Sequence, residues 1–361
     1  MKSIAVIGAA GFVGSRLVES CLLKGVKGIC AVVRGPRNLG KLCRLGSALK
    51  VKMADAENVD VLSDAIKGCS TVVNVTMSHD PMKIIKSTKA IHLACVAAGA
   101  KHFIHLSSAV VYGQVESPMI NDDSPPLAKH WMPYARAKSD SELFLREVSG
   151  LSPVEITVLR PGIVWGPRST WSLNAAQDLI YNKAYLVDDG AGVCNSIYID
   201  NLISCILTCC SRKTDASGFF NVSDAEFVTW RDFYESLAGY LRYDMAKIPK
   251  VSSDHFRPSL NSFLNDVKLH HIYIKIKEKI PEDTRALVKF WLGGKFISHK
   301  KYNKRGKGGM KLQVTRDMWH LQTVRHKLPN EKFSKRFNYA PPVSFHKGTR
   351  LTINWLKFIG I

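Results

Sequence analysis

The 361-residue chain contains no run of eighteen consecutive apolar residues, so a membrane-spanning helix is not expected. Its amino terminus starts with a short strand-like run that glycines soon interrupt, which does not fit a secretory signal peptide. The nine cysteines form no CxxC pair, and Cys205, Cys209 and Cys210 stand in an apolar stretch without His or carboxylate. We therefore expect core thiols and no metal site. An odd number of free thiols suits a reducing cytoplasm.

Acidic residues are scarce in the last third of the chain. Residues 241–361 hold 26 Lys and Arg against 8 Asp and Glu, a net charge of +18, whereas residues 1–240 have a net charge of +3. The run HKKYNKRGKGGMK (299–311) is either a solvated basic loop or a surface for an anionic partner. No nucleic-acid-binding module accompanies this charge, so nucleic acid is not an expected partner.

One stretch of the basic segment 240–330 has an amphipathic pattern. Apolar residues that can share one helical face, with lysines on both sides, are Ala286, Leu287, Lys289, Phe290, Trp291 and Lys295. Two interpretations stay open: packing on the rest of the protein, and peripheral contact with an anionic membrane. The location we expect is cytoplasmic, with the inner face of a membrane as the alternative.

A glycine-rich turn stands between the first predicted strand and the first predicted helix. Gly8, Gly11 and Gly14 follow the apolar run IAVI and precede apolar residues with helical period. Glycines at such positions permit a tight turn, let backbone N–H groups approach a pyrophosphate, and allow the helix to pack on the strand. The pattern predicts a dinucleotide-binding turn, and its cofactor-binding residues are Gly8, Gly11, Phe12, Val13 and Gly14.

The end of the second predicted strand favours NADP(H) over NAD(H). Folds that select NAD usually place an acidic residue there to bind the ribose 2′-hydroxyl. This chain has Arg34, with Arg37 close behind, and no carboxylate. Because an arginine fork suits a 2′-phosphate, we expect NADP(H), with NAD(H) as the alternative. The simpler interpretation, an exposed surface arginine, stays open.

Strands and helices continue to alternate through residues 49–113, which predicts an α/β fold with a Rossmann-like, doubly wound parallel sheet. A smaller C-terminal substrate domain is expected to follow it. Asp55, after the third strand, is a candidate for adenine contact, and Asn74, after the fourth, is expected at the cofactor edge. Both residues are equally compatible with ordinary polar loop positions.

Several motifs together resemble the extended short-chain dehydrogenase/reductase superfamily. They are the glycine turn, Ser108 four residues before Tyr112, Tyr134 four residues before Lys138, and RPGIVWGP (160–167). The resemblance covers residues 1–235 and 333–357, and its motifs are similar to those of the 3β-hydroxysteroid dehydrogenase and dihydroflavonol reductase branches of the epimerase/dehydratase family. It implies cofactor binding by residues 1–166, completed by 195–222, and a substrate lobe from 167–194 and 223–361.

The resemblance also implies a catalytic set. Tyr134 would be the general acid/base, Ser108 would polarise the reacting oxygen, and Lys138 would bind the nicotinamide ribose. Because an adjacent ammonium favours the phenolate, we expect it to lower the pKa of Tyr134. Pro161 is expected at the cofactor. Relatives often carry an Asn before the fourth helix that extends a proton relay, whereas this chain has Ile84.

The residues after Ser108 restrict the reaction. Dehydratases of the superfamily place an Asp-Glu pair there, whereas this chain has Ala109 and Val110, which cannot move protons. We therefore expect an NADP(H)-dependent oxidoreductase acting on a ketone or secondary alcohol. A nucleotide-sugar epimerase stays open because Arg168 could hold a diphosphate, although Gly162 stands near the position of a common epimerase Asn. A non-catalytic dinucleotide-binding protein is the third alternative, and a homodimer is a further expected assembly.

The aromatic residues of the second half support two interpretations. Trp165, Trp171, Phe219, Phe220 and Trp230 could line a substrate cavity, but aromatics in such numbers usually form core. We expect core.

Overall fold

The computed structural model describes residues 3–36, 39–46, 49–113, 120–127, 129–211, 216–254 and 314–361. The amphipathic stretch at 286–295, the basic run 299–311 and Arg37 lie outside these ranges. The chain divides into two compact units, Met1–Ser253 with His320–Ile361, and Asp254–Trp319. The sheet and every residue of the candidate site belong to the first unit.

Strands and helices alternate through the first half of the chain. They are β1 (Ile4–Ile7), α1 (Phe12–Leu23), β2 (Ile29–Val33), α2 (Gly40–Cys43), β3 (Lys50–Met53), α3 (Val59–Ile66), β4 (Thr71–Asn74), α4 (Pro81–Ala97), β5 (His102–Leu106), the 3-10 helix η3 (Ala109–Tyr112), α5 (Pro133–Ser149) and β6 (Glu155–Pro161).

The second half has shorter strands. Its elements are β7 (Ile163–Trp165), α6 (Thr170–Ile180), β8 (Leu186–Val187), η4 (Asp188–Gly190), β9 (Ser196–Tyr198), α7 (Ile199–Ser211), β10 (Gly218–Val222), α8 (Trp230–Leu241), η5 (Met245–Lys247), β11 (Lys250–Val251), α12 (Arg316–Thr323), α13 (Glu331–Phe337) and α14 (Phe345–Phe358).

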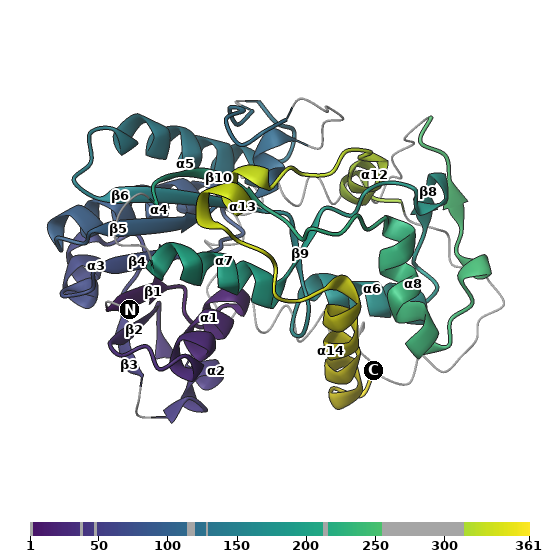
Figure 1. Ribbon diagram of the computed structural model, residues 1–361, viewed down its shortest axis with the longest axis horizontal. Helices are drawn as coiled ribbons and strands as arrows, with labels where there is room; N and C mark the ends of the chain where they lie inside the picture. Colours follow the sequence, from purple (N-terminus) through teal and green to yellow (C-terminus); the bar gives the residue numbers. More distant parts are fainter. Residues whose placement is uncertain are drawn as a thin grey trace, which may run out of the picture. The chain divides into compact units, whose positions relative to one another are not determined.

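Seven strands form one parallel sheet in the order β10-β6-β5-β4-β1-β2-β3. The order reverses between β1 and β4, which creates the crevice where α/β folds bind dinucleotides at the carboxyl ends of their strands. Helices α3, α4 and α5 cover one face of the sheet, and α1 and α7 pack together on the other (Figure 1). The prediction of a Rossmann-like doubly wound sheet is confirmed.

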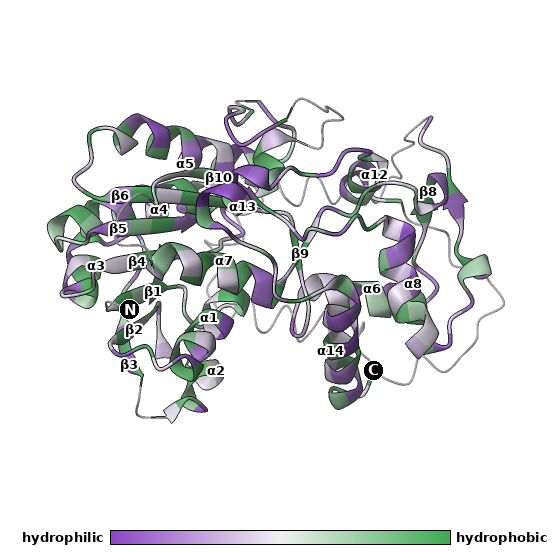
Figure 2. Ribbon diagram, in the orientation of Figure 1, coloured by the Kyte–Doolittle hydropathy of each residue, from purple (hydrophilic) through white to green (hydrophobic). Residues whose placement is uncertain are grey.

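Burial explains why these segments became parallel strands. Every residue of β1 (IAVI) and β2 (ICAVV) is buried, because helices cover both faces of the sheet. At the edge, by contrast, all four residues of β3 are exposed. Helix α7 is coloured mainly hydrophobic in Figure 2, and Cys205, Cys209 and Cys210 are buried within it. These three thiols are core residues, as predicted.

The segment just after residue 319, which the sequence motifs match poorly, packs closely against β8 and the residues before β9. Gln322 is fully buried, and its Oε1 accepts a hydrogen bond from the Val187 N–H at 2.8 Å. Val193 N–H donates to the Val324 carbonyl at 2.7 Å. A Cβ on Gly192 would lie 1.8 Å from the Gln322 carbonyl oxygen, so this close approach requires glycine. The segment therefore completes the small-strand region around β8 and β9.

Trp165, Phe220 and Trp230 are core residues, as predicted, because each is at most 2% exposed. Trp171 and Phe219, for which core was also predicted, are only half-buried. The Trp165 indole N–H donates to Asp224 at 3.3 Å, and Trp230 donates to the Leu321 carbonyl at 3.0 Å. Since buried indoles need partners for their N–H groups, these bonds complete the packing. Within the described part of the chain, no helix is both long and apolar enough to span a bilayer.

Asp224 makes the stability of this core depend on pH. Burial raises its pKa to about 6 from an unfolded value of 3.8, although Asn201 and the Tyr198 N–H donate to the carboxylate. The protonated form is therefore favoured by folding, and we expect the contribution of this carboxyl to the free energy of unfolding to fall by about 2 kcal/mol as pH rises from 4 to 6. Urea denaturation across this range measures the change. An Asp224→Asn variant should lose this step, and an unaltered step would contradict the assignment.

Candidate active site

The glycine turn has the geometry of an anion cradle. Gly8 has φ of +87°, a conformation that favours glycine, and its carbonyl oxygen accepts a hydrogen bond from Gly11 N–H at 2.9 Å. A Cβ on Gly14 would lie 2.2 Å from the same carbonyl oxygen. Helix α1 can therefore begin directly against β1 only with glycine at position 14.

At the start of α1, next to this turn, backbone N–H groups are free of intrahelical hydrogen bonds. Gly11 caps the helix without a side-chain hydrogen bond, and the first N–H groups of any α-helix lack intrahelical acceptors. Phe12 and Val13 occupy these first positions and are half-buried. The residues present fit a diphosphate, because backbone donors, the helix dipole and the absence of side chains converge there.

Arg34 and Asp55 stand at neighbouring strand ends. Arg34 directly follows β2 and is exposed. Asp55 follows β3 and is also exposed, and its Oδ1 accepts a hydrogen bond from the Glu57 N–H at 3.0 Å. Both residues lie at the carboxyl edge of the sheet, where the adenosine half of a dinucleotide would be bound.

Asn74 is more deeply placed than its sequence position indicated. It is 2% exposed, and its Oδ1 accepts hydrogen bonds from the N–H and hydroxyl of Thr76 at 3.0 and 2.7 Å. Its amide nitrogen lies 3.1 Å from Nδ1 of His105. The side chain thus fixes the end of β4 against β5, and a direct contact with cofactor stays a prediction for this residue.

Ser108 and Tyr134 are brought together, as the motif analysis expected. Ser108 directly precedes η3, and its Oγ accepts from the Val110 N–H at 3.3 Å. Tyr134 lies in the first turn of α5, which begins with Pro133, and its phenol lies beside the Ser108 side chain, which favours the ionised phenol. Proline suits this first helical position because it has no N–H to leave unpaired.

Lys138 lies one turn farther along α5 and is only 3% exposed. Its Nζ donates a hydrogen bond to the Leu106 carbonyl oxygen, at the end of β5, at 2.8 Å. Burial lowers the pKa of Lys138 to about 8, while the carboxylate of Glu142 acts in the opposite direction. The ammonium is thus held at the sheet edge, beside the crevice.

The pKa of the Tyr134 phenol differs from the value expected from the sequence. Burial raises the pKa of Tyr134 to about 12, and the neighbouring Ser108 side chain only partly offsets this. The expected lowering by Lys138 is not found, because the ammonium points to the Leu106 carbonyl. The chain by itself therefore keeps Tyr134 protonated at neutral pH, in the form that can donate a proton.

The positions at which relatives carry proton-transfer or phosphate-binding side chains have small or apolar residues in this chain. Ala109 and Val110 begin η3 and are half-buried beside Ser108. Ile84 is buried in α4, where its carbonyl oxygen accepts hydrogen bonds from the hydroxyls of Ser87 and Thr88. Gly162, near the position of the epimerase Asn, could not carry a side chain, since a Cβ would lie 2.2 Å from the Asn195 carbonyl oxygen.

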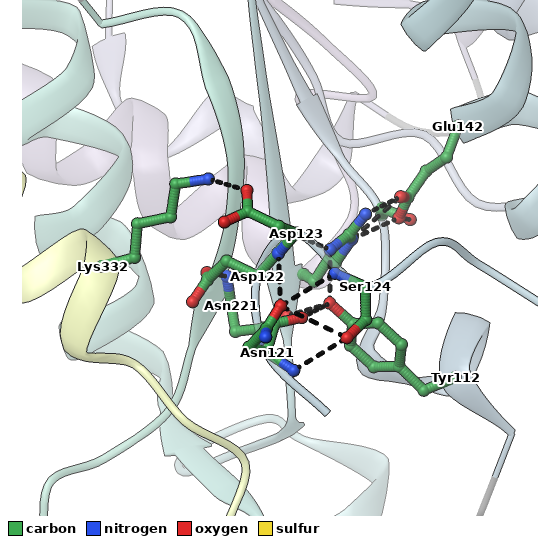
Figure 3. A network of polar contacts seen from close by, with 10 residues as sticks. Tyr112, Asn121, Asp122, Asp123, Ser124, Glu142, Asn221 and Lys332 are labelled. Atoms are coloured by element: carbon green, nitrogen blue, oxygen red, sulfur yellow. Dashed lines mark hydrogen bonds and ion pairs between the residues drawn. The ribbon is translucent and has the colours of Figure 1, made fainter. Parts of the chain in front are cut away.

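Sequence analysis missed a buried polar network that includes Tyr112, Glu142 and Asn221 (Figure 3). Glu142 and Arg160 are both fully buried and form an ion pair, with Arg160 Nη2 2.6 Å from Glu142 Oε2. The Tyr112 hydroxyl accepts a hydrogen bond from Arg160 and donates to Asn221 Oδ1 at 2.8 Å. The spacing of Glu142, four residues after Lys138, is the one sequence signal that could have indicated it.

His105 is a second residue that the sequence did not indicate. It is 1% exposed on β5, and burial, together with the nearby Lys138 charge, holds its pKa well below the usual value. It is therefore a neutral imidazole at pH 7. Among the described residues, no group of three or more His, Cys, Asp or Glu could hold a metal ion.

Comparison with known proteins gives a family match. The model of the NAD dependent epimerase/dehydratase family matches residues 4–223, more than half of the chain. The chain is 26% identical over 256 residues to UDP-glucose 4-epimerase of Vibrio cholerae, covering 66% of this chain and 75% of the relative. It is 24% identical over 253 residues to the decarboxylating sterol-4-alpha-carboxylate 3-dehydrogenase of Dictyostelium discoideum, covering 65% and 75%.

A solved structure with a similar fold is that of dTDP-glucose 4,6-dehydratase from Bacillus anthracis str. Ames in complex with NAD. The TM-score is 0.70 at 15% identity, with 100% of this chain and 98% of that chain covered. At this identity the likeness concerns the fold alone.

Proposed function

Since the chain belongs to the NAD dependent epimerase/dehydratase family, we propose that it is an NADP(H)-dependent oxidoreductase that reduces a ketone to a secondary alcohol. The observation that carries the proposal is that Ser108 lies beside the phenol of Tyr134, with Lys138 buried one turn farther along the same helix. In this proposal residues 1–166, completed by 195–222, hold the cofactor, and 167–194 with 223–361 form the substrate lobe.

Each of the three side chains has a separate task in this reaction. When bound, NADPH supplies the hydride. Ser108 donates a hydrogen bond to the substrate carbonyl oxygen and orients it, and Tyr134 gives its hydroxyl proton to that oxygen as negative charge develops. The raised pKa of Tyr134 supports this direction, since a protonated phenol is the form that reduction requires. Lys138 holds positive charge at the sheet edge and would bind the nicotinamide ribose.

The two apolar residues that follow Ser108, Ala109 and Val110, favour a reductase over a dehydratase. Elimination of water needs groups that remove and return protons, and the side chains of Ala109 and Val110 can do neither. The same apolar pair favours a substrate whose carbon skeleton is not highly polar. Cofactor binding itself would rest on Gly8, Gly11, Phe12, Val13 and Gly14 at the diphosphate, with Arg34, Asp55, Asn74, Lys138 and Pro161 around the rest of the dinucleotide.

A second candidate is a nucleotide-sugar epimerase, because the similarity to UDP-glucose 4-epimerase of Vibrio cholerae extends over 256 residues. Epimerisation can use the same serine, tyrosine and lysine, and Arg168 is exposed after β7, where it could meet a diphosphate. The cytoplasmic location, the homodimer and the contact with an anionic membrane stay predictions.

Cofactor turnover separates the two candidates. The purified protein is titrated with NADPH and with NADH by fluorescence and then incubated with a panel of ketones and UDP-sugars. Net oxidation of NADPH by a ketone supports the reductase. Interconversion of UDP-sugars without net change in the cofactor would favour the epimerase and contradict the first proposal.

Replacement of Arg34 tests the choice of cofactor. We expect Arg34→Ser to weaken NADPH binding about 10- to 100-fold, because a charge-assisted bond to the 2′-phosphate is lost. NADH affinity should stay within about twofold, since NADH lacks that phosphate. Arg350→Ser, which removes an exposed arginine from α14, is the matched control. Equal effects on NADPH and NADH would contradict a role of Arg34 in selection.

A further inference from the structure

The buried ion pair of Glu142 and Arg160 anchors both ends of the segment 107–112, here called the serine loop because it carries Ser108. At the start of the loop, Ser107 Oγ donates to Glu142 Oε1. At its end, the Tyr112 hydroxyl accepts a hydrogen bond from Arg160 Nη1. Glu142 and Arg160 bind each other through two guanidinium nitrogens, with Nε 2.9 Å and Nη2 2.6 Å from Oε2. The loop and the pair thus form one continuous network (Figure 3).

We propose that Glu142 and Arg160 are positioning residues that hold Ser108 in place against Tyr134 and Lys138. This inference rests on the proposed function, in which those three side chains carry the reaction. Glu142 lies on α5, one turn after Lys138 and two turns after Tyr134, so its bond to Ser107 ties the serine loop to the helix of the other two groups.

The network is suited to fixing geometry because its parts have little freedom. Both charges are fully buried, and a two-nitrogen contact fixes the orientation of a guanidinium as well as its distance. Arg160 Nη1 also donates to the Asp122 carbonyl at 2.9 Å, and Tyr112 donates to Asn221 on β10. The loop is therefore held to α5, β6 and β10 at once. Small displacements of reacting groups reduce turnover steeply, so such anchoring matters for rate.

Glu142 has a second effect on the same site. Its carboxylate attracts the Lys138 ammonium and opposes the effect of burial, which lowers the pKa of that lysine. Since the bonds to Arg160 hold the Glu142 carboxylate in place, the pair also favours the charged form of Lys138.

Two mild variants test the anchoring while leaving the ion pair intact. We expect Ser107→Ala and Tyr112→Phe each to lower kcat about 10- to 100-fold, with NADPH affinity within about twofold of wild type. The controls are Ser141→Ala and Tyr240→Phe, which also remove one side-chain hydrogen bond each, to the Ala137 and Ile361 carbonyls. Both controls should keep kcat within about twofold. If the four variants had the same kcat, the positioning role would be wrong.

A spectroscopic measurement tests the same inference without a substrate. In protein with 13C-labelled tyrosine, the ring signal of Tyr134 reports its contact with the Ser108 hydroxyl, and Ser108→Ala gives the shift for loss of that contact. We expect Ser107→Ala and Tyr112→Phe to move the Tyr134 signal toward the Ser108→Ala position. A signal that stays at the wild-type position would overturn the inference.

The two proposals fail in different ways. If wild type reduces no ketone and Tyr134→Phe changes no reaction, the proposed function fails, and the NMR shifts still decide the positioning role. If wild type is active and Tyr134→Phe is not, but Ser107→Ala and Tyr112→Phe match their controls, only the positioning role fails.

Discussion

Replacement of Tyr134 by phenylalanine is expected to reduce turnover of a ketone substrate about 100- to 10,000-fold, the usual contribution of a well-placed general acid. The change removes the phenol that acts as proton donor in the proposed reaction, and it leaves the glycine turn and Arg34 untouched. NADPH affinity should therefore stay within about twofold. Stopped-flow measurement of NADPH oxidation gives the turnover, and fluorescence titration gives the affinity.

The matched control is Tyr240→Phe, which deletes a phenol that bonds to the Ile361 carbonyl far along the chain from α5. Its turnover should stay close to that of wild type. Retention of more than about a tenth of wild-type turnover in Tyr134→Phe would contradict the assignment of this residue as general acid.

A single change in the Glu142–Arg160 pair is expected to destabilise the fold by about 3–5 kcal/mol, because it leaves a buried charge without its partner. Arg160→Met is the variant to measure, since methionine keeps much of the length of the side chain but has no charge. Both residues are fully buried, so solvent cannot replace the lost partner. The free energy of unfolding is obtained from urea denaturation at pH 7.

Two further variants give this measurement its controls. Lys247→Met removes one member of an exposed pair with Asp244, 3.9 Å apart, and should change the free energy of unfolding by less than about 1 kcal/mol. Combining Arg160→Met with Glu142→Leu should recover much of the lost stability, because the pair is then replaced by apolar groups. An Arg160→Met protein as stable as wild type would show that the pair is not structurally important.

Local patterns in the sequence were sufficient to predict the sheet and to select the residues of the candidate site. The runs IAVI and ICAVV predicted buried parallel strands, and the family match confirms the extended short-chain superfamily and an enzyme. The spacing of Tyr134 and Lys138 placed both on one helix, where the structure has them. Each of these predictions depends on residues close together in the chain, whose geometry is set by helix and strand periodicity.

Contacts between residues far apart in the chain could not be predicted from the sequence. Arg160 meets Glu142 from another element, and Tyr112 bonds to Asn221, which is 109 residues away. The direction of the Tyr134 pKa was expected wrongly, because it depends on how deeply the phenol is buried and on which acceptor Lys138 finds. None of these contacts leaves a periodic signal in the chain.

The sequence by itself determined a dinucleotide-type turn, a doubly wound sheet and a helix with a phenol one turn from an amine, since short-range steric rules dictate all three. Only the tertiary structure decided which charges share the interior and which carbonyl binds the amine, because burial and long-range pairing exist only once the layers have packed.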